Sequence, residues 1–262
     1  MTQLQNGIIE LAPNAKDKSY SHFLPHHGVR KQNRETTKLR IVFDASAKFN
    51  KSSYSLNDCL EKGPNGIPHL FDILLKFRSN PIGLVADIEK AFHQIAIEHK
   101  DRDALRFLWF NNITKPRPEI VQYRFCRLVF GLTPSPAILN ETIQHHLTRY
   151  LLKEPDMAKL LCKSFYVDDF ITGAPDEENG FHIFKRAKEL MFNGGFNLRK
   201  WRTNSSILQL KIDQSDATVL SDQIHQTESV KILGMNWDTS VDKFYFNFED
   251  IIIFAKSLTP TV

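Results

Sequence analysis

The strongest indication of a chemical site in this chain is a pair of adjacent aspartates, Asp168 and Asp169. They lie in the run Phe165-Tyr166-Val167-Asp168-Asp169-Phe170, with apolar residues on both sides. Like charges this close raise each other's proton affinity unless a cation compensates them. A tight turn that presents both carboxylates to a divalent ion removes this cost. Mg²⁺ suits such a turn, because it prefers oxygen ligands and is usually held by one or two carboxylates with water and substrate phosphates.

A third carboxylate, Asp87, is the natural partner of this pair. It ends the apolar run 82–87, so we expect it at the end of a buried strand. A lone Asp-Asp pair is also typical of a solvated turn, but an apolar strand ending in aspartate and a later aromatic-Val-Asp-Asp hairpin form a specific combination. A site for two ions about 4 Å apart needs a carboxylate that both share. We therefore predict that Asp87, Asp168 and Asp169 bind two Mg²⁺ ions, for which Mn²⁺ is a substitute.

The elements that must position these residues include both strands and helices, in no strict alternation. Apolar runs predict strands, apolar residues three and four apart predict helices, and Gly and Pro mark the breaks. This mixture indicates an α+β fold. The predicted strands and hairpins are 39–43, 82–88, 121–130, 165–172, 230–237 and 243–248, and the predicted helices follow Pro68 and Pro136 and span 177–192.

The charge of the chain is concentrated near its start. The net charge is only +4, but the window Arg30 to Lys51 holds seven basic and two acidic residues. A basic stripe suits a polyphosphate or nucleic-acid backbone, although a solvated face is the ordinary alternative. No apolar stretch is long enough for a membrane span, and the first residues lack the apolar core of a secretory signal. With three scattered cysteines, the chain is expected to be intracellular and not secreted.

Seven motifs, in this order, resemble the reverse transcriptases of long-terminal-repeat retrotransposons, and most closely those of the BEL/Pao type. The resemblance covers about residues 23 to 240. The matching stretches are Leu24-Pro25-His26-His27-Gly28-Val29, Lys38-Leu39-Arg40-Ile41-Val42-Phe43-Asp44-Ala45-Ser46, Ala86-Asp87-Ile88-Glu89-Lys90, Phe130-Gly131-Leu132-Thr133-Pro134-Ser135-Pro136, Phe165-Tyr166-Val167-Asp168-Asp169, Gly194-Gly195-Phe196-Asn197-Leu198-Arg199-Lys200-Trp201 and Leu233-Gly234.

The resemblance implies the fingers and palm of a right-hand polymerase. The palm is then a ferredoxin-like antiparallel sheet backed by helices, and the thumb is absent. The expected boundaries are a loose lead-in at 1–22, fingers at 23–81 and 95–134, palm at 82–94 and 135–248, and a truncated start of a thumb at 249–262.

The same resemblance implies roles at the catalytic centre. Asp87 and Asp168 bind both metal ions, Asp169 supports them, and the backbone carbonyl of Ile88 is a further metal ligand. Lys200 is implied to meet the pyrophosphate, with a surface lysine as the alternative. Tyr166, Leu233 and Gly234 are expected to contact primer and template; Leu233-Gly234 resembles the primer grip, but an ordinary strand with a tightly packed glycine fits as well.

For the incoming nucleotide, the resemblance assigns Arg40 to the triphosphate, and a guanidinium fork suits that task. Lys31 is the candidate for a companion lysine, with Arg30 and Arg34 as rivals and a surface lysine as the alternative. Phe92 matches the steric gate that excludes a ribose 2′-hydroxyl, unless it is a core residue. Phe130 and Gly131 are expected beside the nascent base pair, where glycine permits close approach of the backbone.

The implied activity is RNA-directed DNA polymerisation. The partners are then an RNA or DNA template with its primer, dNTPs, and the protease, RNase H and integrase of a Pol polyprotein, with no membrane. Cytoplasmic virus-like particles or the nucleus are the expected locations. A non-catalytic, transposon-derived remnant that only binds nucleic acid is the main alternative, motivated by the missing thumb. A nucleotidyl cyclase is a weaker one, which Arg40 and the Phe130-Gly131 stretch oppose.

Overall fold

The computed structural model describes residues 2–13, 21–30, 39–112, 114–216, 229–246, 248 and 252. The chain divides into two compact units. Unit 1 comprises residues 1–66 and 90–142, and unit 2 comprises residues 67–89 and 143–262. Both units combine antiparallel sheets with helices, which agrees with the predicted α+β class. Within the described ranges, no helix has the length and apolar character that a bilayer crossing requires.

A four-stranded antiparallel sheet forms the centre of unit 2. Its order is β7-β8-β4-β9, formed by β7 (Phe165–Tyr166), β8 (Asp169–Ala174), β4 (Ile82–Ile88) and β9 (Leu198–Thr203). The predicted strand at 82–88 and the predicted hairpin at 165–172 are confirmed. β4 is buried along nearly its whole length because it lies inside the sheet and is covered on both faces.

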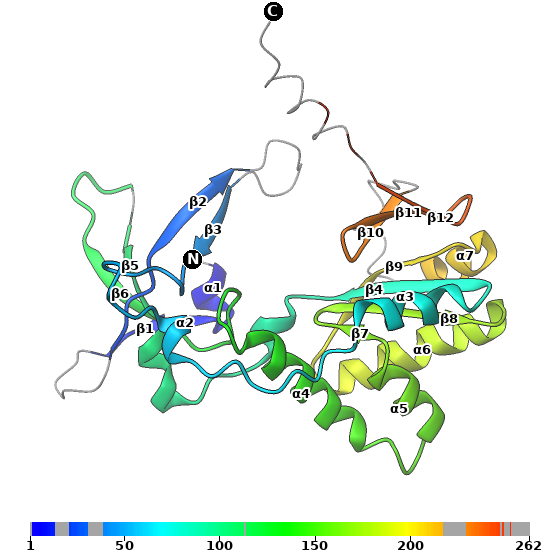
Figure 1. Cartoon of the computed structure of the whole chain (residues 1–262). Coiled ribbons are helices and arrows are strands. Elements are labelled where there is room, and N and C mark those ends of the chain that lie inside the picture. Colours follow the sequence, from blue (N-terminus) through cyan, green and yellow to red (C-terminus); the bar gives the residue numbers. More distant parts are fainter. Residues whose placement is uncertain are drawn as a thin grey trace, which may run out of the picture. The chain divides into compact units, whose positions relative to one another are not determined.

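Two helices cover this sheet from opposite sides (Figure 1). Helix α3 (Leu70–Arg78) packs Phe77 into a core with Val85 of β4 and Trp237. A Cβ atom at Gly83 would lie 2.6 Å from the Phe77 ring, so the glycine lets α3 approach β4. Helix α6 (Glu177–Asn193) lies on the other face, where Phe184 meets Trp201 of β9 at a ring-centroid distance of 5.0 Å.

The helix predicted at 177–192 is α6, and its ends have clear local causes. Asp176 caps the first turn by accepting a hydrogen bond from the amide of Asn179. Gly195, with φ +81°, ends the helix in a conformation that suits glycine. The other helices of the chain with eight or more described residues are α4 (Ser135–Thr148), which confirms the helix predicted after Pro136, α5 (Pro155–Cys162) and α7 (Ser206–Ser215).

A second antiparallel sheet of unit 2 has the order β10-β11-β12, formed by β10 (Ser229–Ile232), β11 (Met235–Asp238) and β12 (Lys243–Tyr245). Leu233 and Gly234 form the two-residue turn between β10 and β11, with φ of +49° and +91°. Positive φ at both positions is the requirement of a type I′ hairpin turn. A Cβ atom on Gly234 would meet nothing within 4 Å, so the alternative of a tightly packed strand glycine is wrong.

Unit 1 contains a three-stranded sheet and a separate hairpin. The sheet has the order β1-β6-β5, formed by β1 (Ile9–Leu11), β6 (Ile120–Phe125) and β5 (Arg106–Phe110). The hairpin pairs β2 (His26–Arg30) with β3 (Leu39–Phe43), and it confirms the strand predicted at 39–43. The short helices are α1 (Thr2–Gln5), α2 (Leu56–Cys59), η1 (Ala91–Gln94) and η2 (His99–Leu105).

The start of the chain differs from the loose lead-in that its polar sequence predicts for residues 1–22. Residues 2–11 contain α1 and β1, and β1 pairs with β6 in the sheet of unit 1. Ile8 is buried, and the Glu10 carboxylate accepts hydrogen bonds from Arg102 and Arg124. Residues 2–11 are thus ordered by ion pairs and by strand pairing with β6. They contain too few apolar residues for periodicity to predict these elements.

Candidate active site

The register of β4 and β8 gathers the three aspartates at one end of the unit 2 sheet. Asp87 pairs directly with Asp169, and the amide of Ile88 donates a 2.9 Å hydrogen bond to the carbonyl of Asp168. Directly paired residues of antiparallel strands have Cα atoms about 4.5–5.5 Å apart. Because side chains alternate along a strand, Asp87 and Asp169 project from the same face as Val85 and Ile171. Residues far apart in the sequence therefore place their carboxylates together.

The turn that presents Asp168 has an unusual backbone. The β7–β8 hairpin closes through Val167 and Asp168, since Tyr166 pairs with Asp169. Val167 has φ +59°, a left-handed conformation that is rare for a β-branched residue and costs on the order of 1–3 kcal/mol. Strain of this kind persists only where the surrounding strands fix the turn. Here the paired strands hold it and thereby fix the direction of the aspartates.

The electrostatics of the site show uncompensated negative charge. Burial, together with the carboxylates of Asp168 and Asp87, raises the pKa of Asp169 to about 6. The pKa of Asp168 is also raised, first by burial and then by Asp87. Lys200 acts in the opposite direction on both groups but does not cancel the repulsion. A cluster that resists ionisation in this way is one that a bound cation would stabilise.

Lys200 of β9 supplies the cation that is present. Its Nζ donates to Oδ2 of Asp87 at 2.6 Å. The β4–β9 pairing shifts register between Val85 and Asp87, and Lys200 itself has φ +53°. The neighbouring Arg199 pairs with Glu89, Nη1 to Oε1 at 2.6 Å. The irregular β4–β9 pairing thus brings Lys200 to Asp87 and Arg199 to Glu89, both at the end of β4.

The aspartates suit a hard divalent cation by donor type, although the protein does not enclose an ion by itself. In the described part of the chain, no three His, Cys, Asp or Glu side chains form a group that could hold a metal. However, Oδ1 of Asp87 is buried and has no hydrogen-bond partner, which leaves one lone carboxylate oxygen for an ion. Water and substrate oxygens would have to complete the coordination, as is usual for Mg²⁺.

Two of the residues expected at the primer lie on the same side of the sheet as the aspartates. Tyr166 and Leu233 pack against the core cluster that contains Ile73, Val85 and Trp237. Gly234 occupies the turn of the β10–β11 hairpin next to Leu233. Strand β7, which precedes the aspartates, and the β10–β11 turn therefore pack against the same hydrophobic cluster of unit 2.

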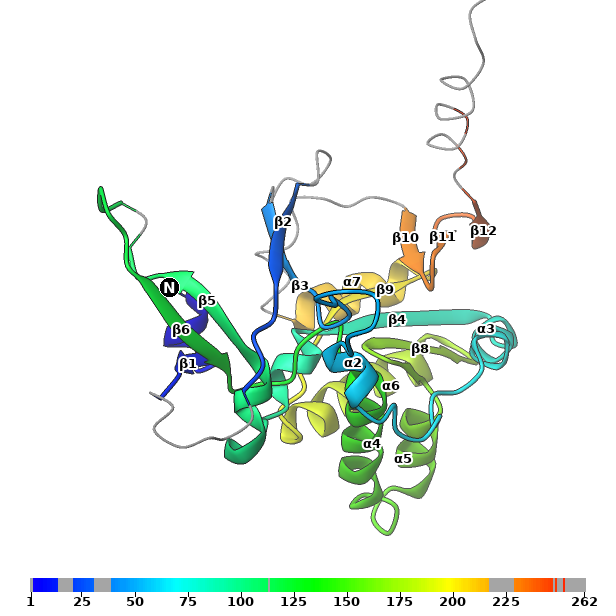
Figure 2. The same cartoon turned by 60° about the vertical axis from the view of Figure 1, so that its left-hand side comes forward.

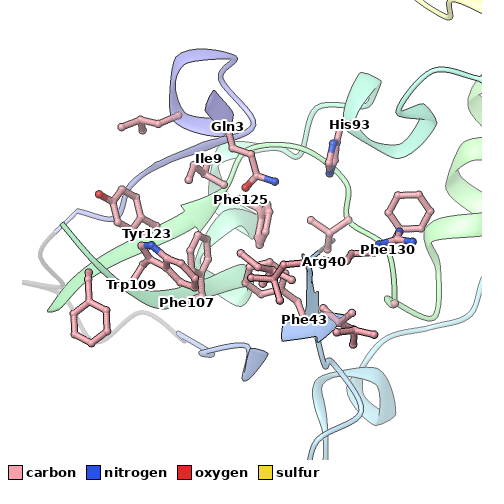
Figure 3. Close-up of a pocket in the computed structure, with 18 of the residues that line it drawn as sticks. Gln3, Ile9, Arg40, Phe43, His93, Phe107, Trp109, Tyr123, Phe125 and Phe130 are labelled. Atoms are coloured by element: carbon pink, nitrogen blue, oxygen red, sulfur yellow. The ribbon is translucent and has the colours of Figure 1, made fainter. Parts of the chain in front are cut away.

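Four of the residues expected at the nucleotide belong to unit 1, namely Arg40, Phe92, Phe130 and Gly131. All of these except Phe92 line an aromatic pocket of about 850 Å³. Its lining residues come mainly from the β2–β3 hairpin and the β1-β6-β5 sheet, with others from α1, from η1 and from residues 129–131. Figure 2 shows this hairpin and this sheet. Figure 3 shows Arg40 running toward Phe130, with the guanidinium carbon 5.5 Å from the ring centroid. Aromatic lining side chains include Phe43, Phe107, Trp109, Tyr123, Phe125 and Phe130. Such walls and one guanidinium suit a flat, negatively charged ligand.

Gly131 lines this pocket, whereas Phe92 lies behind the lining residue Phe130. Phe92 is only 4% exposed and meets the half-exposed Phe130 edge to face, with ring centroids 4.4 Å apart. Gly131 has φ +90°, so the backbone itself requires glycine there. The carboxamide of Asn57 holds this loop by donating to the Gly131 carbonyl and accepting from the Thr133 amide. Asn57 has no signal in the sequence, because it acts across 74 positions.

The companion lysine expected at the triphosphate remains a prediction. Lys31 and its rival Arg34 lie outside the described residues. The other rival, Arg30, ends β2 with an exposed side chain. Nε2 of His146 in α4 is buried and donates to the Leu190 carbonyl at 2.7 Å, so the role of this histidine is structural.

The raised pKa of Asp169 predicts a specific pH dependence of stability in metal-free buffer. A carboxyl whose pKa is about 6 when folded and 3.8 when unfolded stabilises the fold below pH 4 and loses this contribution as the pH rises through 6. After a discount for solvent screening, we expect a loss of about 1–2 kcal/mol.

Urea denaturation in EDTA at pH 4.5 and pH 7.5 measures this loss. Asp169→Asn should be more stable than the unsubstituted chain at pH 7.5 and nearly equal to it at pH 4.5, since only the charged carboxylate is disfavoured. The comparison between the two proteins removes the contributions of all other titrating groups. Parallel pH profiles for both proteins would contradict the prediction.

Comparisons with known proteins bear on this arrangement. The family model for "Reverse transcriptase (RNA-dependent DNA polymerase)" matches residues 15–237. No curated protein sequence matches the chain. Among solved structures, the protease-reverse transcriptase of prototype foamy virus is similar over 75% of this chain and 22% of its own, with 16% identity and a TM-score of 0.54. The foamy viral protease-reverse transcriptase in complex with an RNA/DNA hybrid is similar over 99% of this chain and 27% of its own, with 14% identity and a TM-score of 0.59. The chain thus spans about a quarter of the length of these two proteins.

Proposed function

The chain belongs to the reverse transcriptase family, and from this premise we propose that it is the RNA-directed DNA polymerase domain of a retrotransposon, of the BEL/Pao type. Its reaction is the transfer of a nucleotide from a dNTP to the 3′-hydroxyl of a primer. The observation that carries the proposal is the register of β4 and β8, which pairs Asp87 with Asp169 and places Asp168 in the adjoining turn. A family member that had lost its chemistry would be under no constraint to keep these three carboxylates together.

In this proposal unit 2 is the palm. Its order β7-β8-β4-β9, with α6 between β8 and β9, is that of a ferredoxin-like sheet. Asp87 and Asp168 would hold two Mg²⁺ ions with support from Asp169 and the carbonyl of Ile88. When bound, such a pair of ions lowers the pKa of the attacking hydroxyl and neutralises the leaving pyrophosphate.

The chain's own residues then act by position. Tyr166 and the Leu233-Gly234 turn place the primer end, because both pack on the core that also carries the aspartate strand. The ammonium of Lys200 is available for the pyrophosphate. No side chain has to act as a nucleophile, since the primer hydroxyl fills that role.

Unit 1 supplies the fingers, which select and hold the incoming dNTP. Arg40 would bind the triphosphate through its guanidinium fork, with Lys31 as companion. Phe130 and Gly131 would border the nascent base pair, where the Asn57 side chain keeps their loop in place. An RNA or DNA template with its primer is the partner, and backbone contacts would make binding strongly dependent on salt.

Primer extension tests the proposal. We expect the chain to extend a DNA primer on a homopolymer RNA template with Mg²⁺ and the complementary dNTP. If the isolated chain is inactive, addition of a thumb domain should restore extension, because duplex clamping and metal chemistry are separate requirements. A chain that binds the duplex but remains inactive with a thumb would instead be a non-catalytic remnant.

Replacement of Phe92 with alanine distinguishes a steric gate from a core residue. As a gate, Phe92 excludes the ribose 2′-hydroxyl, and its loss should raise the use of rNTPs relative to dNTPs by roughly tenfold or more. Steady-state incorporation of matched dNTP and rNTP measures this ratio. Phe184→Ala is the matched control, because it removes an equally buried ring from between α6 and β9, away from the proposed nucleotide pocket. A stability loss of about 3–5 kcal/mol with an unchanged ratio would assign Phe92 to the core.

A further inference from the structure

The ion pair between Lys200 and Asp87 has a role that the polymerase reaction does not by itself explain. In β9 the left-handed backbone of Lys200 and the shifted register opposite Val85 and Asp87 are both unfavourable local features. Together they deliver the ammonium to Oδ2 of Asp87 at 2.6 Å. The lysine side chain is 60% exposed, so solvation alone would satisfy it without this contact. The irregular backbone of β9 therefore brings the Lys200 ammonium to Asp87.

The carboxylates need this cation more than the lysine does. Asp87, Asp168 and Asp169 lie within mutual electrostatic range, and Lys200 is the cation that acts on both members of the Asp-Asp pair. Arg199, the nearest basic neighbour in sequence, is engaged with Glu89. One ammonium thus faces three carboxylates: it bonds Oδ2 of Asp87, while Oδ1 of the same carboxylate has no hydrogen-bond partner.

We propose that Lys200 is the counter-ion of the three aspartates whenever no metal is bound, and that it competes with divalent metal for Asp87. This inference rests on the proposed function, because it assumes that Asp87 is a metal ligand. A divalent ion held by the Asp87 carboxylate would take over the ammonium's role of neutralising the three carboxylates, so the two cations would oppose each other's binding through charge. Lys200 then sets how tightly the protein holds metal without nucleic acid, and it stabilises the fold around the aspartates when metal is scarce. It is a positioning residue, distinct from the groups that bind the ions.

The test is the binding of Mn²⁺ to the protein without nucleic acid or nucleotide, measured from the electron paramagnetic resonance signal of free Mn²⁺. Lys200→Ala should bind Mn²⁺ roughly fivefold more tightly than the unsubstituted chain, equivalent to about 1 kcal/mol for an exposed pair. Lys200→Arg keeps the charge and should remain within about twofold. Lys185→Ala is the matched control: it removes the same charge from an exposed position of α6, which covers the opposite face of the sheet.

Thermal unfolding gives a second readout. Without metal, Lys200→Ala should melt at a lower temperature than the Lys185→Ala control, because three carboxylates lose their counter-ion. Saturating Mn²⁺ should remove this difference, so the rise in melting temperature caused by metal is larger in Lys200→Ala. A purely structural lysine would lower the melting temperature equally with and without Mn²⁺.

The Mn²⁺ measurements distinguish a failure of the role proposed for Lys200 from a failure of the metal site at Asp87. Equal Mn²⁺ affinity of Lys200→Ala and Lys185→Ala, combined with loss of binding in Asp87→Asn, would overturn the role of Lys200 and leave the metal site standing. If Asp87→Asn binds Mn²⁺ as well as the unsubstituted chain, the metal site fails, and the competition proposed for Lys200 fails with it. The proposal is supported if Lys200→Ala binds Mn²⁺ more tightly than the unsubstituted chain and Lys185→Ala does not.

Discussion

Substitution of Asp168 with asparagine is expected to reduce primer extension at least roughly a thousandfold, which corresponds to about 4 kcal/mol of transition-state stabilisation. The change keeps the size of the side chain and the Val167–Asp168 turn, but it removes one of the two carboxylates proposed to hold both ions. Catalysis of this kind depends almost entirely on the charge and position of the metal ions. The amide oxygen of asparagine is uncharged and is a much weaker ligand.

The same variant should fold at least as well as the unsubstituted chain when metal is absent. Asp168 is half-buried, and this burial, together with the Asp87 carboxylate, raises its pKa because the charged form is disfavoured there. Removal of that charge relieves repulsion. Melting curves in EDTA therefore separate a loss of chemistry from a loss of structure, since the expected variant is inactive but not less stable.

Asp176→Asn is the matched control for this prediction. It makes the same chemical change in unit 2, at the exposed cap of α6, where asparagine caps a helix about as well as aspartate. Extension and melting temperature should both stay close to those of the unsubstituted chain. Extension by Asp168→Asn within tenfold of the unsubstituted rate would rule out the proposed role of this carboxylate.

The strands that carry the three aspartates could be predicted from the sequence. A continuous apolar run predicts β4 with its observed bounds, because a strand buried on both faces needs no polar alternation. The aromatic residues around Asp168 and Asp169 likewise predict the β7–β8 hairpin. Both signals are local: each depends on residues within one short segment.

Long-range pairings carried no comparable signal. Leu198–Thr203 mixes basic and apolar residues, so nothing local reveals that β9 lies beside β4 or that an irregular register brings Lys200 to Asp87, 113 positions away. The aromatic pocket of unit 1 is lined by residues of five strands and was not predicted as a cavity. A strand's neighbours and a bulge depend on tertiary packing, which composition and periodicity do not encode.

The ordered start of the chain depends on a buried arginine, and this gives the second large expected effect. Arg124 of β6 is 3% exposed. Its Nε donates to Glu10 of β1 at 2.7 Å, and its Nη1 donates to Asp103 of η2 at 2.8 Å. Loss of one partner of a buried ion pair costs about 3–5 kcal/mol when the remaining charge has no other partner. Here Glu10 keeps Arg102 and Asp103 keeps Arg106. We therefore expect Arg124→Met to lower the free energy of unfolding by about 3 kcal/mol, the lower end of this range.

Urea denaturation at pH 7 measures the effect, and acid should reduce it. Burial raises the pKa of Glu10, but hydrogen bonds from Cys126, Arg124 and Arg102 outweigh this and hold the pKa below its ordinary value of 4.5. The stability that the carboxylate contributes is therefore present above pH 4.5 and is lost as the pH falls through the lowered pKa. The difference between Arg124→Met and the unsubstituted chain should shrink over the same range.

Lys100→Met tests whether burial is the cause of the large effect. Lys100 pairs with Glu98 at 3.0 Å, but both side chains are about 70% exposed, so water already solvates each charge. Surface pairs of this kind contribute roughly 0–1 kcal/mol. If Arg124→Met costs no more than Lys100→Met, the ion-pair network is not what holds β1 to β6. Burial of Ile8 and the strand hydrogen bonds would then have to order residues 2–11 by themselves.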